Sequence, residues 1–306
     1  MSFYADLHTH TTRSDGNDSP AELIRNAEKA GVSVIGIADH DVLPPETIEE
    51  DGASYVLGHF AAEHHVKVLP GVEFSCQTYI EDTHLVCYGC DFRAPALGEL
   101  TDEISRYKEE GYLELLERLT ACGMSLSVEE VLAATPGMRL ADLQKKRIFD
   151  MMAQKGYAPD WKAAKLMVRS EAALQVKRKK PDAIRVLALV HAAGGRVILA
   201  HPFLIDPIVP YEGQRISRWE FIDVLISYGL DGIEYRYPYS KTTCLDRRPD
   251  GELWQEIHDR YDGRLFFSSG SDYHNDAKKG TKNGRMIGEC GLTQAEYEKI
   301  ASLLSR

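Results

Sequence analysis

Long apolar runs and cysteines are both scarce in this chain of 306 residues. No run reaches the roughly 18 apolar residues that a membrane-spanning helix needs, and the N-terminus lacks the apolar core of a signal peptide. We therefore expect a cytoplasmic protein without membrane contact. The six cysteines are too sparse for a disulfide framework, so we expect buried free thiols at Cys76, Cys87, Cys90, Cys122, Cys244 and Cys290.

Basic residues are also in the minority. The chain has 36 Lys and Arg against 47 Asp and Glu, a formal net charge of -11, which argues against a protein that coats DNA. It has no repeat at solenoid periods, no low-complexity tract, no Gly-x-Ser-x-Gly motif and no P-loop. What it does have is 43% hydrophobic residues, enough for a sizeable core.

Hydrophobic patterning predicts a chain that alternates between strands and helices. The expected strands lie at 3–10, 32–38, 66–70, 84–88, 197–200, 232–235 and 265–267. The expected helices lie at 20–30, 44–65, 182–193, 219–228, 251–261 and from 293 onward. Seven strands alternating with helices imply a parallel sheet, and this length favours a closed or nearly closed α/β barrel.

The alternation is interrupted between residues 97 and 180. Leu100, Ile104, Leu115 and Leu119 recur at helical spacing, and Ser127 with Glu130 forms a capping box for a further helix. We interpret 97–180 as an inserted helical subdomain that covers the site. The barrel would then comprise residues 1–96 and 181–306.

Residues that can bind metal ions lie at or beside the expected strands. His8 and His10 are two apart on the first strand, so both point to one side, and Asp272 and His274 repeat that spacing after the last strand. The carboxyl ends of barrel strands meet on one face, where active sites are built. Each residue alone fits an ordinary core or rim position, so their joint placement carries the prediction. The candidate ligands are His8, His10, Asp15, His40, Glu73, His84, His201, Asp272 and His274.

Six imidazoles and three carboxylates exceed what one ion can bind. Zinc takes about four ligands and larger first-row ions take about six. The set therefore predicts two or three divalent ions, and mixed nitrogen and oxygen ligands without thiolate suit Mn, Fe or Zn. Asp6, Asp39 and Asp41 lie beside candidate ligands, and they could either orient imidazole N–H groups or serve as ordinary turn and capping residues.

Six short motifs contain these residues and extend over nearly the whole chain. They are His8-Thr9-His10 with Ser14-Asp15-Gly16, Ala38-Asp39-His40-Asp41, Gly71-Val72-Glu73, His84-Leu85-Val86, Ala200-His201-Pro202 and Gly270-Ser271-Asp272-Tyr273-His274. In this order they resemble the motif set of the polymerase and histidinol phosphatase (PHP) family. The resemblance implies a distorted seven-stranded barrel, a trinuclear metal centre with all nine ligand positions filled, and phosphoester hydrolysis.

The resemblance is closest to the subgroup with a helical insertion between the fourth and fifth strands. That subgroup resembles 3',5'-bisphosphate nucleotide phosphatases and 5'-3' exoribonucleases of the ribonuclease AM type. It implies a metal-dependent phosphoesterase whose substrate is a phosphorylated nucleotide or a short RNA. The expected chemistry is in-line attack on phosphorus by a hydroxide, formed because bound ions pull the pKa of water from 15.7 toward about 7.

Two alternatives to this function stay open. The same metal site could serve a histidinol-phosphate-type phosphatase, although a small aminoalcohol phosphate needs a grip on only one phosphate. A metal-stabilised barrel could also act as a non-catalytic regulatory module. We expect no stable protein partner in any of these cases.

Charge is segregated within the predicted insertion. Residues 97–138 contain nine acidic and three basic residues, whereas 139–180 contain four acidic and twelve basic residues. Basic clusters near a site can hold phosphates through charge-assisted hydrogen bonds, although a solvated helix face explains most such lysines. This asymmetry favours a phosphate-rich substrate.

Two arginines are the candidates for substrate binding. Arg139 resembles the subgroup's insertion arginine, but Leu140-Ala141 follows it where the family tends to have Pro-His. Arg13 lies in the first ligand loop. Lys278, Lys279 and Arg285 are weaker candidates near the last ligand loop.

Overall fold

The computed structural model describes residues 3–77 and 82–305, and the chain divides into two compact units. The barrel unit consists of Met1–Gly98 and Pro181–Arg306, and the helical unit consists of Glu99–Lys180. In the described part of the chain, no helix combines the length and the apolar character that crossing a membrane requires.

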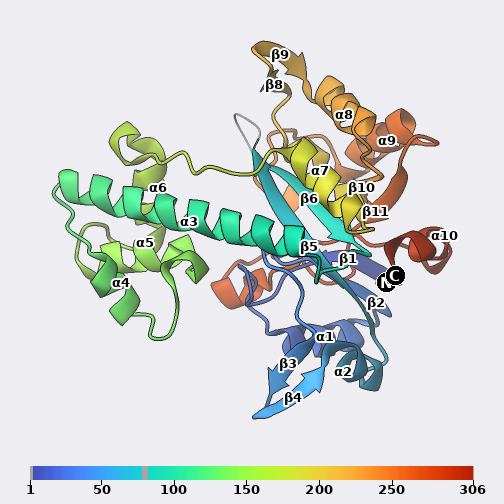
Figure 1. Cartoon of the computed structure of the whole chain (residues 1–306), viewed down its shortest axis with the longest axis horizontal. Helices are drawn as coiled ribbons and strands as arrows, with labels where there is room; N and C mark the ends of the chain where they lie inside the picture. The colour runs from blue at the N-terminus through green and yellow to red at the C-terminus, as the bar shows by residue number, and fades with distance from the viewer. Residues whose placement is uncertain (1–2, 78–81, 306) are drawn as a thin grey trace. The chain divides into compact units, whose positions relative to one another are not determined.

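Seven strands of the barrel unit form one sheet that nearly closes on itself (Figure 1), which confirms the predicted fold class. Their order in the sheet is β1 (Ala5–Thr9), β2 (Val34–Ile37), β5 (Lys67–Gln77), β6 (Asp82–Tyr88), β7 (Arg196–Leu199), β10 (Gly232–Arg236) and β11 (Phe266–Ser269). At the seam, Thr9 bridges Tyr273 in parallel and the His10 N–H donates to the Tyr273 carbonyl at 2.9 Å. The first strand therefore meets the chain just after the last one.

The sheet is not wholly parallel, so that part of the prediction is wrong. Strand β6 runs antiparallel to both neighbours, with Gly71 opposite Tyr88 and Leu85 opposite Leu199. Only residues 78–81 separate β5 from β6, and a parallel crossover needs about a dozen residues. Because β6 is reversed, its beginning lies at the rim where the other strands end, and His84 lies close to that beginning.

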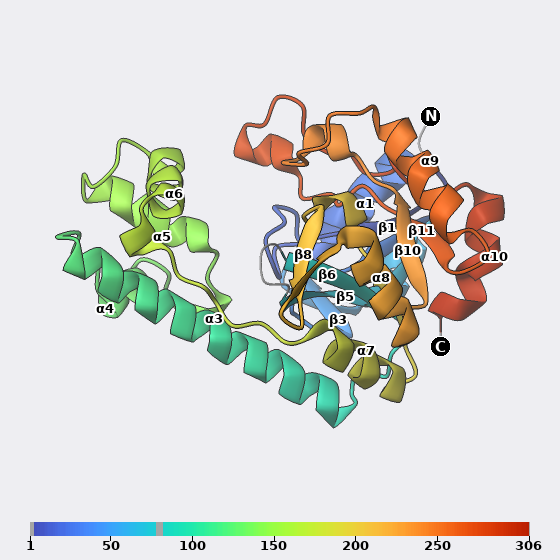
Figure 2. The same ribbon diagram turned by 90° about the horizontal axis from the view of Figure 1, so that it is seen from above.

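Helix α1 (Pro20–Ala30) of the barrel unit begins and ends where local signals predict. Ser19 and Glu22 form a capping box, and Gly31 ends the helix in the left-handed conformation. Figure 2 shows α8 and α9 on the outside of the strands that they accompany, β10 and β11. The other helices are α2 (Leu57–Glu63), α7 (Ala183–Ala192), α8 (Arg218–Ser227), α9 (Asp250–Tyr261) and α10 (Gln294–Leu304).

The helix predicted over 44–65 is mostly wrong. The segment forms a hairpin of β3 (Thr47–Glu50) and β4 (Ala53–Val56), and only α2 is helical. Asp51 and Gly52 make its two-residue loop with φ of 49° and 76°, the left-handed pair whose twist suits adjoining strands. A second hairpin, β8 (Ile208–Tyr211) and β9 (Gln214–Ser217), was not predicted.

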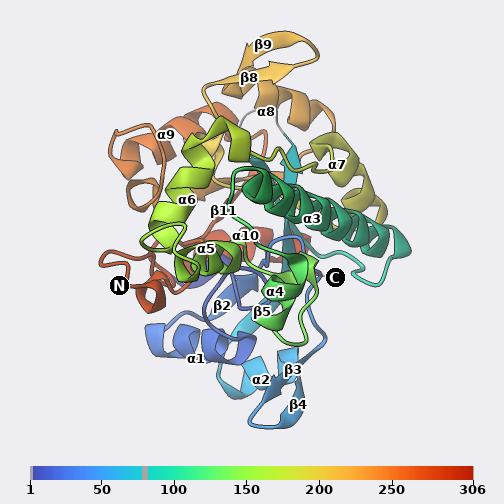
Figure 3. The same ribbon diagram turned by 90° about the vertical axis from the view of Figure 1, so that its left-hand side faces the viewer.

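The helical unit has a hydrophobic core of its own. Its helices are α3 (Pro95–Ala121, which begins in the barrel unit), α4 (Val128–Ala133), α5 (Lys145–Gln154) and α6 (Trp161–Ser170), seen together in Figure 3. Leu115, Leu119, Val131, Ile148 and Met152 are buried against one another. The predicted capping box at Ser127 and Glu130 is present at the start of α4.

The cysteines largely follow the prediction of buried free thiols. All six are free, and five of them are buried. Cys122, just after α3, is exposed, so the prediction is wrong for that residue. It follows the last turn of α3, where apolar periodicity no longer determines which side faces the core.

Tyr88 fills the interior of the barrel below the rim. Its ring is fully buried, and its hydroxyl donates to the Leu7 carbonyl on β1 at 2.6 Å. The ring passes over β2 at Gly36, where an added Cβ would lie 2.1 Å from the Tyr88 oxygen and 3.0 Å from Leu7 backbone. Glycine is therefore required at position 36 by close approach.

We predict that Gly36→Ala destabilises the protein by about 1–3 kcal/mol, because the buried Tyr88 ring has nowhere to move. Urea unfolding followed by circular dichroism measures the change. Gly58→Ala, in α2, is the matched control, since a Cβ there meets nothing within 4 Å. That control should lie within about 1 kcal/mol of the parent. Equal stability of the Gly36 variant and the parent would contradict this packing.

Candidate metal centre

Glu73 is the centre of a buried cluster of imidazoles at the rim of the barrel. Its side chain is fully buried on β5, and each of its two oxygens faces more than one ring. Oε2 lies 3.1 Å from His8 Nε2, 3.2 Å from His10 Nε2 and 3.1 Å from His40 Nδ1. Oε1 lies 3.0 Å from His84 Nδ1 and 3.2 Å from His201 Nε2.

Two further carboxylates extend the cluster to the last ligand loop. Asp272 Oδ1 lies 3.1 Å from His10 Nε2 and 3.4 Å from His274 Nδ1. Asp15 Oδ1 lies 2.8 Å from His274 Nε2. The rings of His10 and His274 stack with centroids 4.2 Å apart. All nine residues singled out in the sequence therefore meet in one continuous cluster.

The cluster is assembled from strands that are distant in sequence. His8 lies in β1 and His10 just after it, while His40 follows β2 and pairs with Glu73 by a parallel bridge. His201 follows β7, and Asp272 and His274 follow β11. The reversed β6 contributes His84 from its beginning, so the same rim supplies every member.

The donor atoms of this cluster fit metal ions. Native proteins pair nearly all buried polar atoms, yet several here lack a hydrogen-bond partner of good geometry among the described residues. These atoms are His8 Nε2, both ring nitrogens of His10, Asp15 Oδ1, His40 Nδ1, Glu73 Oε2 and His201 Nδ1. Their chemistry, imidazole nitrogen and carboxylate oxygen, is that of transition-metal ligands.

Among the residues that the structure describes, three groups of donor atoms are close enough to share an ion, with all atoms of a group within 4.8 Å of one another. They are His10 with Asp15, His40 and His274; His8 with His10 and Glu73; and His40 with Glu73 and His84. His10, His40 and Glu73 each belong to two groups. Such sharing is consistent with a multinuclear site.

Two of the candidate ligands have strained backbones. His201 has φ 28° and Asp272 has φ 51°, in the left-handed region that costs non-glycine residues about 1–3 kcal/mol. Hydrogen bonds hold both. The His201 N–H donates to Glu234 Oε2 at 2.7 Å, and the Tyr237 hydroxyl donates to Asp272 Oδ2 at 2.8 Å. Strain of this kind is typical of functional positions.

Glu234 and Tyr237 were missed by reasoning from the sequence. Both are buried, and each contacts a candidate ligand. A signal for Glu234 did exist, since a carboxylate between Ile233 and Tyr235 in a buried strand must have a partner. Nothing local to Tyr237 indicates its partner.

Asp6 and Asp39 serve the loops that carry ligands. Asp39 accepts hydrogen bonds from the Thr11 N–H at 2.8 Å and from the Ser14 hydroxyl at 2.6 Å. Asp6 accepts from the Ser271 N–H at 2.9 Å. Of the two roles considered from the sequence, the turn role describes these contacts. Asp41 likewise accepts from the Ser75 N–H, at 2.8 Å.

The cations near the ligand loops have different partners. Arg13 donates to the Leu43 carbonyl at 3.0 Å, and Lys279 donates to the Asp15 carbonyl at 2.8 Å. Lys278 pairs with Asp18 and Glu22. Arg285 is the one of these four that forms an ion pair with a candidate ligand, Asp272, and it also pairs with Asp276.

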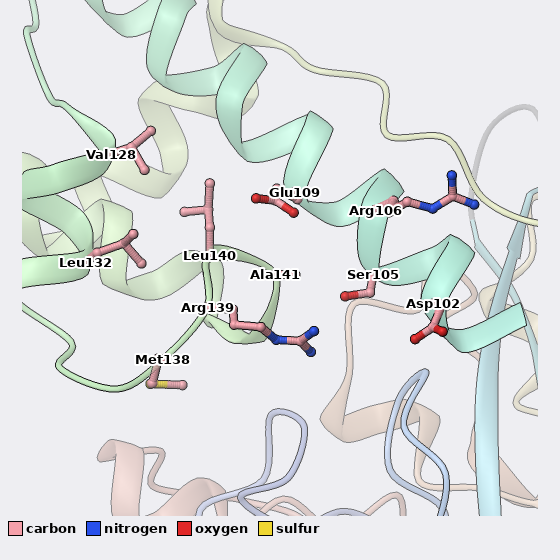
Figure 4. Close-up of a pocket in the computed structure, with 10 residues that line it drawn as sticks. All are labelled: Asp102, Ser105, Arg106, Glu109, Val128, Leu132, Met138, Arg139, Leu140 and Ala141. Atoms are coloured by element: carbon pink, nitrogen blue, oxygen red, sulfur yellow. The ribbon is translucent and has the colours of Figure 1, made fainter. Parts of the chain in front are cut away.

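Arg139 lines a pocket of about 600 Å³ within the helical unit. Figure 4 shows its side chain extending from the loop before Leu140 toward α3, which carries Asp102, Ser105, Arg106 and Glu109. Its guanidinium makes two hydrogen bonds to Asp142, at 2.8 and 2.9 Å, and is largely exposed. The remaining lining residues are apolar: Val128, Leu132, Met138, Leu140 and Ala141.

Six imidazoles sharing three carboxylates determine the protonation of the cluster. Burial opposes ionisation of Glu73, but His40, His8 and His84 outweigh it and hold its pKa well below the usual range. Burial also opposes the charged form of His10, yet the carboxylates of Asp272 and Glu73, 3.1 and 3.2 Å from Nε2, raise its pKa to about 10. Burial lowers the pKa of His40 to about 4. Without a cation, His10 therefore holds a proton at neutral pH and His40 does not.

A known protein family matches more than half of the chain. A model of the PHP domain matches residues 6–163. A structure of a candidate metal-dependent phosphoesterase from Bifidobacterium adolescentis superposes with a TM-score of 0.74 at 22% identity, covering 99% of this chain and 96% of that chain. At 22% identity, this structural similarity shows a shared fold.

Curated relatives match over most of their length. A 5'-3' exoribonuclease from Haemophilus influenzae is 28% identical over 270 residues, 88% of this chain and 89% of the relative. A phosphoribosyl 1,2-cyclic phosphate 1,2-diphosphodiesterase from Eggerthella lenta is 27% identical over 88% of this chain and 93% of the relative. A 3',5'-nucleoside bisphosphate phosphatase from Chromobacterium violaceum is 26% identical over 88% of this chain and 86% of the relative.

We predict that Mn²⁺ binding to the metal-free protein releases protons at neutral pH. A cation that takes a ring nitrogen of His10 must displace its proton, which is held because the pKa is raised to about 10. The apparent affinity should therefore rise as the pH increases from 6 to 9. Calorimetric titration in two buffers of different ionisation enthalpy counts the protons. Heats that do not depend on the buffer would contradict this protonation state.

Proposed function

The chain belongs to the PHP domain family and is a phosphoesterase of that family, and from this premise we propose that it hydrolyses phosphate esters of nucleotides or short oligonucleotides. The observation that carries the proposal is the buried cluster of nine candidate ligands, in which five imidazoles converge on the carboxylate of Glu73 and the other three join through Asp272 and His274. A site of this composition suits esters that carry much negative charge.

We propose that the nine residues hold two or three divalent ions, which are Mn, Fe or Zn. Bound there, such ions would activate water and offset charge that develops on phosphoryl oxygens. The role of the protein is to keep the ligands in place within a buried rim. Glu73 and Asp272 supply negative charge, and Arg285 beside Asp272 supports that carboxylate through its ion pair.

The substrate class is supported by what the relatives' names have in common. RNA, a phosphoribosyl cyclic phosphate and a nucleoside bisphosphate all carry phosphate on the sugar of a nucleotide or of ribose. The basic half of the helical unit, at 139–180, suits such a ligand because it offers twelve cations against four carboxylates. We propose Arg139 and, second to it, Arg13 as residues that bind a phosphate of the substrate.

A second candidate function is cleavage of a cyclic phosphate on ribose. The Eggerthella lenta relative favours it, because it is 27% identical over 88% of this chain and the exoribonuclease from Haemophilus influenzae is 28% identical over the same share. Both reactions require water to attack phosphorus at a cationic site, so the same cluster would serve either. The substrate therefore distinguishes them.

A panel of phosphoesters tests the proposal. We expect a nucleoside 3',5'-bisphosphate or a 5'-phosphorylated oligoribonucleotide to have a kcat/KM at least about tenfold above that of histidinol phosphate. The second phosphate adds at least one charge-assisted hydrogen bond, worth about 1.5–3 kcal/mol. Chromatography of the products formed by the Mn²⁺-loaded protein ranks the compounds, because a monoester yields inorganic phosphate whereas an oligoribonucleotide yields mononucleotides. A ribose 1,2-cyclic phosphate, which would open to a monoester, completes the panel.

Removal of metal is the control for this panel. Chelation should abolish turnover of every substrate, and resupplied Mn²⁺ should restore it. Turnover that survives complete chelation would contradict the metal-dependent function. Preference for histidinol phosphate over both nucleotides would contradict the proposed substrate class.

We predict that Arg139→Gln raises the KM for a nucleoside bisphosphate about 10- to 100-fold, with a smaller effect on kcat, because one charge-assisted contact to the substrate is lost. Steady-state kinetics measure the split. Arg118→Gln is the matched control: Arg118 also pairs with a carboxylate of the helical unit, Glu114 at 2.7 Å, but does not line the pocket. Equal KM values for the two variants would contradict the role of Arg139.

A further inference from the structure

We propose that Glu234 is a positioning residue, which holds His8 with Nε2 toward the cluster and fixes the backbone of His201. The inference rests on the proposed metal site. Glu234 lies on β10 with only 2% of its surface exposed, and it belongs to none of the three donor groups described above. Its two oxygens instead contact two candidate ligands, one through the ring and one through the backbone.

The contact to His8 determines which ring nitrogen is free. Glu234 Oε1 lies 3.1 Å from His8 Nδ1, while His8 Nε2 lies 3.1 Å from Glu73 Oε2. A neutral imidazole carries one N–H, and a carboxylate oxygen accepts. When Nε2 binds a cation, the ring can carry its proton only on Nδ1, where Glu234 Oε1 accepts it.

The contact to His201 holds a strained backbone. The His201 N–H donates to Glu234 Oε2 at 2.7 Å, and His201 has φ 28° and ψ 61°. An extended backbone, which would continue β7, would direct the residue differently. Glu234 thus keeps the chain turned at the point where the His201 ring joins the cluster, 3.2 Å from Glu73.

The chemistry of these two contacts makes Glu234→Gln a sharp test. Both oxygens of Glu234 accept an N–H, but a glutamine amide has only one accepting oxygen. The N–H of His201 cannot change, whereas His8 can exchange its tautomer. The amide oxygen should therefore remain on His201 and the NH₂ should face His8 Nδ1. That arrangement moves the His8 proton to Nε2, where it blocks metal binding.

Asp231 offers a matched control at the other end of the same strand. Its Oδ2 lies 2.8 Å from His191 Nε2 and accepts the Val197 N–H at 2.9 Å. It therefore binds an imidazole and a backbone N–H, as Glu234 does. Asp231 precedes β10, so Asp231→Asn removes the same kind of carboxylate away from the rim that carries the cluster.

The experiment compares Zn²⁺ binding by the parent, Glu234→Gln and Asp231→Asn. Competition with a chromophoric chelator gives the apparent Kd, and circular dichroism reports the fold. Long-range ¹H–¹⁵N correlations of the zinc-loaded proteins identify the tautomer of His8. We expect Glu234→Gln to bind at least one zinc about 10- to 100-fold more weakly, with the His8 proton on Nε2. Asp231→Asn should match the parent within about twofold.

Several results would overturn the inference. Parent-like zinc affinity in Glu234→Gln, or an equal loss in Asp231→Asn, would show that Glu234 does not position the ligands. If Glu234→Gln does not fold, the zinc-loaded parent decides: a proton on His8 Nδ1 supports the role, and a proton on Nε2 overturns it.

Failure of the proposed function gives a different result. A parent protein that binds zinc but hydrolyses no phosphoester of the panel would overturn that function, and the affinity comparison would still decide the role of Glu234. A parent that binds no zinc would overturn the metal site and, with it, this inference.

Discussion

The rest of the site depends on the contacts between the buried carboxylate of Glu73 and the five imidazoles around it. A buried carboxylate is stable only when charge or hydrogen bonds compensate for the loss of water. Here the compensation comes from five rings on β1, on β6 and on the segments after β1, β2 and β7, each with a nitrogen within 3.2 Å of one of its two oxygens. Each of these rings competes for the same two oxygens. The donor atoms left without good partners are the reason why the cluster suits divalent cations.

The barrel serves this arrangement by bringing strand ends to one rim. Tyr88 fills the interior below that rim, and the bridge between Thr9 and Tyr273 brings the last ligand loop beside His10. Reversal of β6 does not break the pattern, because it brings the beginning of that strand, with His84, to the same place. Support from Glu234 and Tyr237 then holds two strained residues, His201 and Asp272, in position.

The helical unit differs from the barrel in having its own core and a strongly basic half. Its core is independent of the barrel, and its second half carries most of its positive charge. Many of those cations are already paired, as Lys146 is with Asp150 and Lys155 with Glu130. Such pairs are typical of a solvated surface, which is the ordinary interpretation of most of the basic residues. That this unit covers the metal centre stays a prediction.

The sequence by itself determined what depends on near neighbours. The capping boxes at Ser19 and Ser127 and the two-residue periodicity that pairs His8 with His10 need only a few adjacent residues, so they could be recognised directly. The direction of β6 and the first hairpin also had local signals, the short connection at 78–81 and the turn at Asp51 and Gly52. Tertiary structure alone decided the closure of the sheet and the partners of Glu234. The contact between His8 and Glu234 spans 226 residues, and no local pattern encodes a pairing at that distance. Local signals select element types and donor chemistry, whereas only packing of the closed sheet decides which distant side chains satisfy one another.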